Sequence, residues 1–233
     1  MRFPRKSVAA VAAATAVASI SAATALAAMV DGTDGDDQLF GTPRSDLVLA
    51  KAGNDTVVAN AGNDGIDAGE GNDAAFGNTG RDNISGGPGD DVLDGGRGRD
   101  VVFGQDGADT VLGRQGDDEV RGRNGDDVVR GGRGRDRVFA GVGVDRTYGG
   151  PGADVMFALA KADAATPGGD TLFAGRDNDV VRVSDGEADT VDCGRGRRDV
   201  AIVDPGSLDT VRNCERVIPR PPRQESDSGE VGS

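Results

Sequence analysis

Residues 86–103 read GGPGDDVLD GGRGRDVVF, two rows of nine residues with Gly at positions 1, 2 and 4 and Asp at position 6. The same frame extends in both directions without a gap, giving fourteen rows from Gly32 to Phe157. Position 6 is Asp in all fourteen rows, position 4 is Gly in thirteen, and position 8 is aliphatic in nearly every row. A fixed short period of this kind is typical of repeat architectures, so we expect a solenoid.

Each row predicts one turn followed by one short strand. Positions 1–6 are rich in Gly and Asp, which tolerate tight turns, and positions 7–9 carry strand-forming residues such as Val, Leu, Ile and Phe. Because side chains alternate along a strand, position 8 is expected to face inward while positions 7 and 9 face the other way. One row cannot bury its aliphatic residue alone, so rows must stack. Two rows would make one coil, with a strand on each face and a turn at each edge.

The composition is not that of an ordinary globular domain. The chain has 39 Gly, 3% aromatic residues and no Trp, and its 40 acidic residues outnumber 26 basic ones, for a net charge of −14. An acidic disordered chain and a solenoid that buries small aliphatic residues both fit these values, and the unbroken period favours the solenoid. The negative charge argues against nucleic acid as a partner and favours cations. With no His and two Cys, a four-cysteine zinc site is excluded.

The carboxylates at position 6 predict a metal site. In a stack, those of alternate rows would lie above one another at about 4.8 Å, and they would repel unless a cation sat between them. Calcium binds six to eight oxygens, including carboxylates and main-chain carbonyls, and a Gly-rich turn exposes its carbonyls. For an isolated Asp, a residue that caps its own turn is an equally good interpretation.

The rows resemble the nonapeptide G-G-x-G-x-D-x-U-x, with U a large aliphatic residue, of the RTX (repeats-in-toxin) or hemolysin-type calcium-binding family. The resemblance covers the fourteen rows in strict register. It implies an all-β, right-handed parallel β-roll that binds several Ca²⁺ ions. It also implies that each ion lies between the turns of rows i and i+2, bound by Asp side chains and main-chain carbonyls. The metal ligands expected from it are Asp37, Asp46, Asp55, Asp64, Asp73, Asp82, Asp91, Asp100, Asp109, Asp118, Asp127, Asp136, Asp145 and Asp154.

Some rows depart from the family pattern. Arg44 replaces the Gly at position 4, which puts the turn of that row and the site at Asp46 in question. A lesser departure is the replacement of Gly at position 2 by Lys51, Gln105, Arg114 and Arg123. Because the period stays unbroken despite these departures, the regular β-roll is expected over residues 32–157.

Residues 158–218 predict irregular C-terminal coils. A seven-residue insertion follows Phe157, after which the frame resumes with Asp170 and Asp179 at position 6. Asp189, Asp199 and Asp209 then follow at ten-residue spacing, as expected of atypical terminal repeats. Residues 219–233, PRPPRQESDSGEVGS, predict a disordered tail.

The two cysteines lie in these coils. Cys193 and Cys214 are 21 residues apart, close to one coil of two ten-residue rows, so they are expected on adjacent coils. A disulfide is favoured there over two free buried thiols, because an exported protein permits one.

The N-terminus predicts export. Three basic residues among the first six precede an uncharged stretch rich in Ala and Val, which ends in the A-x-A pattern Ala25-Leu26-Ala27. This is the layout of a secretory signal peptide over residues 1–27. A membrane anchor is the alternative, but the stretch is only weakly hydrophobic and no second apolar run of spanning length follows. Cleavage after Ala27 would leave 23 basic and 40 acidic residues, a net charge of −17.

The sequence contains no catalytic pattern that we recognise. It has no His and no H-E-x-x-H or G-x-S-x-G motif, and the rows begin within five residues of the expected cleavage site. We therefore expect no enzyme, but a secreted calcium-binding β-roll with calcium-dependent folding and a structural or interaction role outside the cell. Its expected partners are calcium ions and an unidentified extracellular ligand, with no stable membrane anchor. The alternatives are an adhesin-like accessory module of an extracellular matrix and a secreted enzyme. A family role as a toxin is not carried over, since that family's usual export signal is C-terminal.

Overall fold

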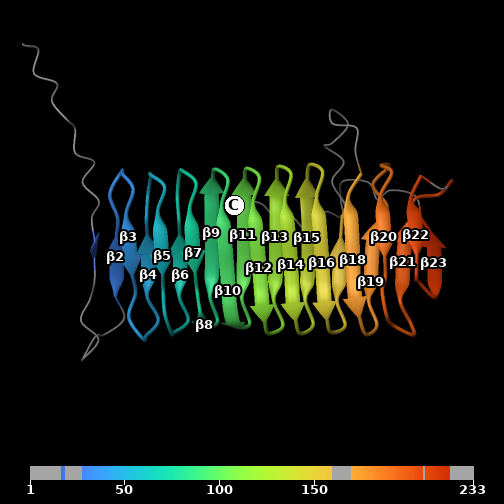
Figure 1. Ribbon diagram of the computed structural model, residues 1–233, viewed down its shortest axis with the longest axis horizontal. Helices are drawn as coiled ribbons and strands as arrows, with labels where there is room; N and C mark the ends of the chain where they lie inside the picture. The colour runs from blue at the N-terminus through green and yellow to red at the C-terminus, as the bar shows by residue number, and fades with distance from the viewer. Residues whose placement is uncertain (1–16, 19–27, 159–168, 207, 221–233) are drawn as a thin grey trace, which may run out of the picture.

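The computed structural model describes residues 17–18, 28–158, 169–206 and 208–220. These residues form two parallel β-sheets, one of twelve strands and one of eleven, which face each other along the whole length of an elongated roll (Figure 1). Among the described residues there is no helix, and hence none that could cross a membrane. The all-β parallel β-roll implied by the repeat is confirmed.

Apart from β7 and β8, which both pair with β10, consecutive strands alternate between the two sheets, so each coil contributes to both. Sheet A contains β1 (Val17–Ala18), β3 (Gln38–Phe40), β5 (Thr56–Val58), β7 (Ala74–Phe76), β8 (Thr79–Gly80), β10 (Val92–Gly98), β12 (Thr110–Gln115), β14 (Val128–Arg133), β16 (Arg146–Pro151), β18 (Thr171–Arg176), β20 (Thr190–Asp192) and β22 (Thr210–Arg212). Sheet B contains β2 (Met29–Asp31), β4 (Leu47–Leu49), β6 (Gly65–Asp67), β9 (Asn83–Pro88), β11 (Val101–Asp106), β13 (Glu119–Asn124), β15 (Arg137–Val142), β17 (Val155–Phe157), β19 (Val180–Val183), β21 (Val200–Val203) and β23 (Arg216–Pro219).

The strand register follows the repeat. Val102 of β11 pairs with Val120 of β13, and Val111 of β12 pairs with Val129 of β14, so equivalent positions two rows apart lie side by side. This shift of eighteen residues is the predicted coil of two rows. Equivalent side chains therefore form straight files along the roll.

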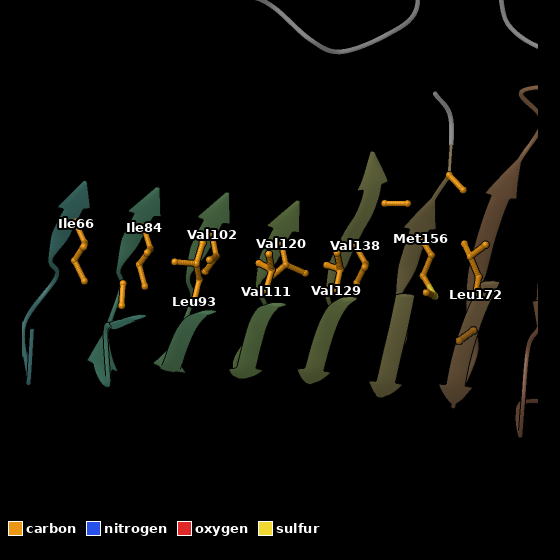
Figure 2. Packing of buried hydrophobic residues seen from close by; sticks show 14 of the residues in the cluster. Ile66, Ile84, Leu93, Val102, Val111, Val120, Val129, Val138, Met156 and Leu172 are labelled. Atoms are coloured by element: carbon orange, nitrogen blue, oxygen red, sulfur yellow. The ribbon is translucent and has the colours of Figure 1, made fainter. Parts of the chain in front are cut away.

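The core consists of position 8 side chains from both sheets. Ile84, Leu93, Val102 and Val111 are completely buried, and side chains from the two sheets meet between the strands (Figure 2). Position 1, which is Gly or Ala, is also buried, because alternation along the strand brings it to the inner side after position 9. The core is therefore narrow, as the scarcity of large side chains predicted.

Gly occurs at position 4 for two reasons, one conformational and one steric. All twelve position 4 glycines from Gly53 to Gly152 have φ between +120° and +156°, where other residues are strained. A Cβ on Gly116 would also lie 1.3 Å from the carbonyl oxygen of Gly98 in the coil before it. Neither Gly35 nor Arg44, at position 4 of the first two rows, has a positive φ. The turn that contains Arg44 thus differs from the regular ones.

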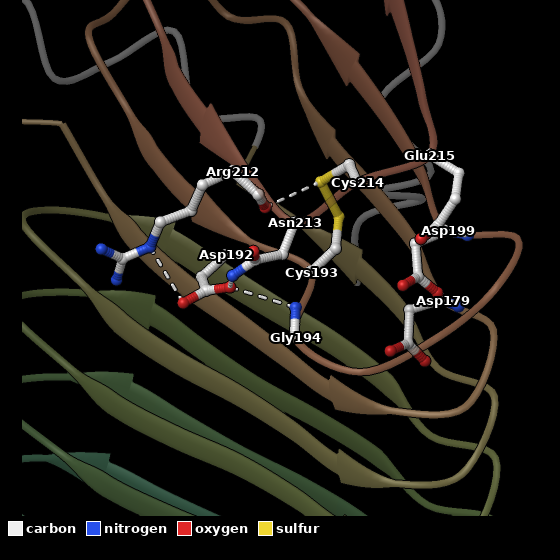
Figure 3. The surroundings of a disulfide bond; sticks show 9 residues. All are labelled: Asp179, Asp192, Cys193, Gly194, Asp199, Arg212, Asn213, Cys214 and Glu215. Carbon is white, nitrogen blue, oxygen red and sulfur yellow. Dashed lines mark hydrogen bonds and ion pairs between the residues drawn. A yellow bond between two sulfur atoms is a disulfide. The ribbon is translucent and has the colours of Figure 1, made fainter.

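The C-terminal coils continue both sheets across the insertion. Most of the insertion lies in residues 159–168, outside the described residues, but Arg146 of β16 pairs with Thr171 of β18 beyond it. The predicted disulfide joins Cys193 and Cys214, with 5.2 Å between their Cα atoms, and Cys193 is completely buried (Figure 3). β23 ends at Pro219, and Arg220 donates its N–H to the carbonyl of Val203. The rest of the predicted tail, residues 221–233, lies outside the described residues.

At the other end, β1 pairs in parallel with β3. Its two residues belong to the segment predicted to be a signal peptide, and the rest of residues 1–27 lies outside the described residues.

We expect Gly116→Ala to destabilise the roll much more than Gly186→Ala. Both residues have positive φ, so both substitutions introduce backbone strain of roughly 1–2 kcal/mol. Only at Gly116 does the added Cβ also collide with a neighbouring carbonyl, because a Cβ on Gly186 meets no atom within 4 Å. Thermal unfolding in excess calcium measures the difference. Equal losses of stability would contradict the role given to close stacking of the coils.

Candidate metal centres

The position 6 side chains form two straight files, one at each edge of the roll. The first file lies where the chain passes from sheet B to sheet A, and the second where it passes back. The first file consists of Asp37, Asp55, Asp73, Asp91, Asp109, Asp127, Asp145, Asp170, Asp189 and Asp209. The second consists of Asp46, Asp64, Asp82, Asp100, Asp118, Asp136, Asp154, Asp179, Asp199 and Glu215.

A ladder of hydrogen bonds holds each file. Up to the last coil, each Asp donates its main-chain N–H to the Oδ1 atom of the Asp one coil further on, as from Asp82 to Asp100 and from Asp100 to Asp118, both at 2.9 Å. Except for the terminal Asp209, the Asp side chains are almost completely buried, and Asp100 and Asp145 are 0% exposed. The sheet register therefore fixes each carboxylate in the turn with one of its oxygens bound.

The second oxygen, Oδ2, has no such partner in most rows. It is buried and accepts no hydrogen bond in Asp55, Asp64, Asp73, Asp82, Asp91, Asp100, Asp109, Asp118, Asp127, Asp136, Asp154, Asp179, Asp189 and Asp199. A buried charged oxygen without a partner costs several kcal/mol, so such atoms normally meet a donor or a metal. Its recurrence in coil after coil marks a site that the protein alone does not complete.

A main-chain carbonyl approaches the same place as Oδ2. The point where a Cβ of Gly86 would lie is 2.2 Å from Asp91 Oδ2 and 2.6 Å from the carbonyl oxygen of Gly104 in the next coil. Gly104 repeats the arrangement with Asp109 Oδ2 and the carbonyl oxygen of Gly122, at 2.3 and 2.6 Å. Carboxylate and carbonyl oxygens of successive coils thus converge beside a residue without a side chain.

The oxygens present suit calcium. Calcium binds carboxylate and carbonyl oxygens at about 2.3–2.6 Å with six to eight ligands. Among residues 28–158, 169–206 and 208–220, no three His, Cys, Asp or Glu side chains form a group that could hold a metal ion. Main-chain carbonyls must therefore complete each ligand set. The fourteen predicted Asp residues occupy equivalent places, and their coordination of calcium stays a prediction.

The first two rows differ. Thr33 donates its N–H to Asp37 Oδ2 at 2.6 Å, and Thr42 donates its N–H to Asp46 Oδ2 at 2.5 Å. The hydroxyl groups of both Thr residues also lie within hydrogen-bonding distance of these carboxylates. Protein donors therefore satisfy the carboxylates of the N-terminal coil, and sequence reasoning about Asp37 missed this cap. Thr in place of Gly at position 2 was the available signal.

The files extend beyond the fourteen predicted ligands. Asp170 and Asp179 resume them after the insertion, followed by Asp189, Asp199 and Asp209. Their position in the resumed frame was visible in the sequence. Glu215 ends the second file by accepting the N–H of Asp199, close to the disulfide (Figure 3). The repeat did not predict Glu215 as a file residue, because its side chain is longer than that of Asp and its spacing from Asp199 is shorter than in the other rows.

Burial changes the protonation of the metal-free files. Burial is the main reason why the pKa values of Asp91, Asp100, Asp127 and Asp154 rise from 3.8 to about 7. Neighbouring carboxylates of the same file raise these pKa values further, and the main-chain N–H donors oppose the shift. Near the C-terminal end, burial and the adjacent Asp185 raise the pKa of Asp189 to about 9. A bound cation would therefore have to displace protons from these groups.

Comparison with known families gives one match. The model of the RTX calcium-binding nonapeptide repeat, in four copies, matches overlapping windows of the chain. These windows are residues 31–66, 40–75, 67–102, 76–111, 85–120, 103–138, 121–156 and 165–197. Together they cover the regular array and the first resumed rows, but not the last coils. No curated protein matches the chain.

We expect acid to replace calcium in part. The pKa values of the files in the folded protein lie near 7 and those of the unfolded chain near 3.8, so between these values only the unfolded chain loses its protons. The stability of the metal-free roll is therefore greatest below about pH 4 and falls as the pH rises towards about 7. Far-UV circular dichroism in excess chelator should show β structure increasing as the pH is lowered from about 8 to about 4. β content that stays constant, or that rises with pH, would contradict this.

Proposed function

Because the chain belongs to the RTX calcium-binding nonapeptide repeat family, we propose that it is a secreted β-roll that folds on binding calcium and has a structural or interaction role outside the cell. The observation that carries the proposal is the buried, unpartnered Oδ2 atom that recurs along both files. The calcium binding of the family supports the choice of ion.

The argument for calcium-dependent folding compares two opposing effects. The core is a narrow double file of mostly Val, Ala and Leu, which limits the apolar area that folding buries. Against it stand two continuous files of buried carboxylates with raised pKa values, whose ionisation opposes folding at neutral pH. Calcium between the carboxylates would reverse the second effect. Its binding free energy would then become folding free energy.

The residues of the chain have distinct parts in this proposal. Beyond the first two rows, the position 6 Asp residues offer Oδ2 to the ion, while Oδ1 stays on the N–H of the preceding coil and fixes the carboxylate. Position 1 Gly leaves space beside Oδ2, and its carbonyl supplies a ligand to the adjacent coil. Bound calcium supplies the positive charge that both neighbouring coils need.

Two features of the chain support a location outside the cell. Residues 1–27 have the layout of a cleavable secretory signal, and the disulfide between Cys193 and Cys214 suits an oxidising compartment. Cleavage after Ala27 would remove β1 and leave β3 as the first strand of its sheet. For the mature protein we propose no enzymatic activity, in line with the generally structural role of RTX repeats.

Calcium should fold the protein, and an interior file residue should matter more than a terminal one. Asp100 has file neighbours on both sides, whereas Asp37 has one and also receives the N–H of Thr33. We expect Asp100→Ala to raise the calcium midpoint of folding several-fold and Asp37→Ala to raise it less, because the first removes a ligand from two gaps. Far-UV circular dichroism during calcium titration measures both midpoints.

The unchanged protein in excess chelator at about pH 7.5, above the file pKa values, is the control, and it should lack most of its β content. Full β content there, or equal midpoint shifts for the two variants, would count against calcium-dependent folding of stacked coils.

Export should depend on residues 1–27. Expression of the full chain in a secreting host should release a protein that begins at Ala28, as N-terminal sequencing would show. Substituting both Ala25 and Ala27 by Leu keeps the apolar stretch but removes the small residues of the cleavage site, so the protein should stay uncleaved. A released protein that begins at Met1, or retention of the unchanged chain inside the cell, would contradict the proposal.

A further inference from the structure

Charged side chains are unevenly distributed over the surface of the roll, which the net charge of the chain does not reveal. Most of its acidic excess lies in the two buried files, where calcium would balance it. Outside the files, residues 31–94 carry seven acidic and three basic side chains, whereas residues 95–148 carry four acidic side chains and ten Arg. The outer surface thus changes sign along the roll, from acidic near the N-terminus to basic in the middle.

Several of these basic residues lie on neighbouring strands of sheet A, without acidic residues among them. The four neighbouring strands β12, β14, β16 and β18 of sheet A contain no acidic residue (Figure 1). They carry five exposed Arg residues, which we name the arginine face: Arg114, Arg130 and Arg146 at outward strand positions, and Arg133 and Arg176 at the edge next to the turn. Arg114 forms an ion pair with Asp94 of β10. Among the described residues, none of the other four forms an ion pair.

Aromatic rings hold part of this face in order. The guanidinium group of Arg130 lies 4.9 Å from the centre of the Tyr148 ring, and Tyr148 stacks on Phe173 with 5.1 Å between ring centres. Stacking on a ring fixes a guanidinium without using its N–H groups, which stay available for carboxylate or sulfate oxygens. The face therefore offers N–H donors to an anion, and some of these donors are already ordered before the anion binds.

The dimensions suit an extended polymer. Strands of a sheet lie about 4.8 Å apart, so β12 to β18 span roughly 14 Å along the roll. Along the strands, the Arg positions spread over six successive residues, or about 17 Å. A flat patch of this size with several separate positive groups matches a chain that carries a negative group on successive units.

We propose that the arginine face binds a linear acidic polysaccharide through its carboxylate or sulfate groups. Single-stranded nucleic acid is the weaker candidate, because its bases need free aromatic faces, and both faces of Tyr148 are covered by Arg130 and Phe173. The choice of a glycan rests in part on the proposed export, which brings the protein into contact with such polymers.

Calcium would control this binding through folding. Asp109, Asp127, Asp145 and Asp170 of the first file directly precede the four strands of the face, so ions that hold these turns also hold the strands. At neutral pH the face would therefore exist only in the calcium-bound roll.

The experiment uses the full chain, folded in excess calcium, and fluorescently labelled hyaluronate, a glycan with regularly spaced carboxylates. Fluorescence anisotropy should show binding that weakens as NaCl is raised, and no binding to neutral dextran. Arg130→Glu with Arg146→Glu should weaken binding by about tenfold or more, since the change removes two charge-assisted contacts and places two negative charges against the polyanion. Circular dichroism in calcium checks that the variants fold. Arg133→Gln with Arg176→Gln, at exposed edge positions, is a milder second pair.

The matched control is Arg81→Glu with Arg99→Glu, which changes the net charge equally at exposed turn positions outside the four strands of the face. This pair should bind nearly as well as the unchanged chain. Equal loss in control and face variants, or no hyaluronate binding by the folded protein, would overturn the assignment. Tighter binding of single-stranded or duplex DNA than of hyaluronate would overturn the choice of polymer. Both failures leave calcium-dependent folding, observed in the same samples, unaffected.

Discussion

A carboxylate buried in every turn is the constraint on which the rest of the structure depends. The parallel register of each sheet places the Asp of one coil over that of the next, and the N–H to Oδ1 bond fixes it there. The geometry that gives the roll its regularity thus also accumulates like charge at both edges. Such an arrangement is stable only when protons or cations neutralise the carboxylates of the files. The raised pKa values are the consequence for protons, because these buried carboxyl groups keep their protons to a higher pH than in the unfolded chain.

The remaining features of the repeat follow from close stacking of coils around these files. From Gly53 to Gly152, Gly is needed at position 4 because a Cβ would meet the carbonyl of the neighbouring coil, and a small residue at position 1 leaves room beside Oδ2. Position 8 supplies a modest apolar core that keeps the two sheets together. At the ends, where stacking stops, the chain uses other means. Thr33 and Thr42 satisfy the first carboxylates, Glu215 closes the second file, and a disulfide joins the last coils.

The period predicted most of this from the sequence. It located the inward residues such as Val102 and Val111, the coil of two rows, and the file positions of all fourteen Asp residues. It also anticipated the disulfide from the spacing of Cys193 and Cys214. The caps were missed, because each departs from the repeat: Thr33 and Thr42 replace Gly at position 2, and Glu215 replaces Asp at a shorter spacing. The arginine face could not be predicted from the net charge, because composition does not distinguish the Asp residues buried in the turns from the exposed Arg residues outside them.

The most direct test of the central claim is a count of bound calcium ions along the folding transition. Equilibrium dialysis with elemental analysis would measure ions per chain in the same samples whose β content is recorded. In the fourteen regular rows each file has seven carboxylates and six gaps between them, so the account predicts up to about twelve ions there, acquired together with the β content. One or two bound ions at full β content, or many ions bound before any β structure forms, would contradict it.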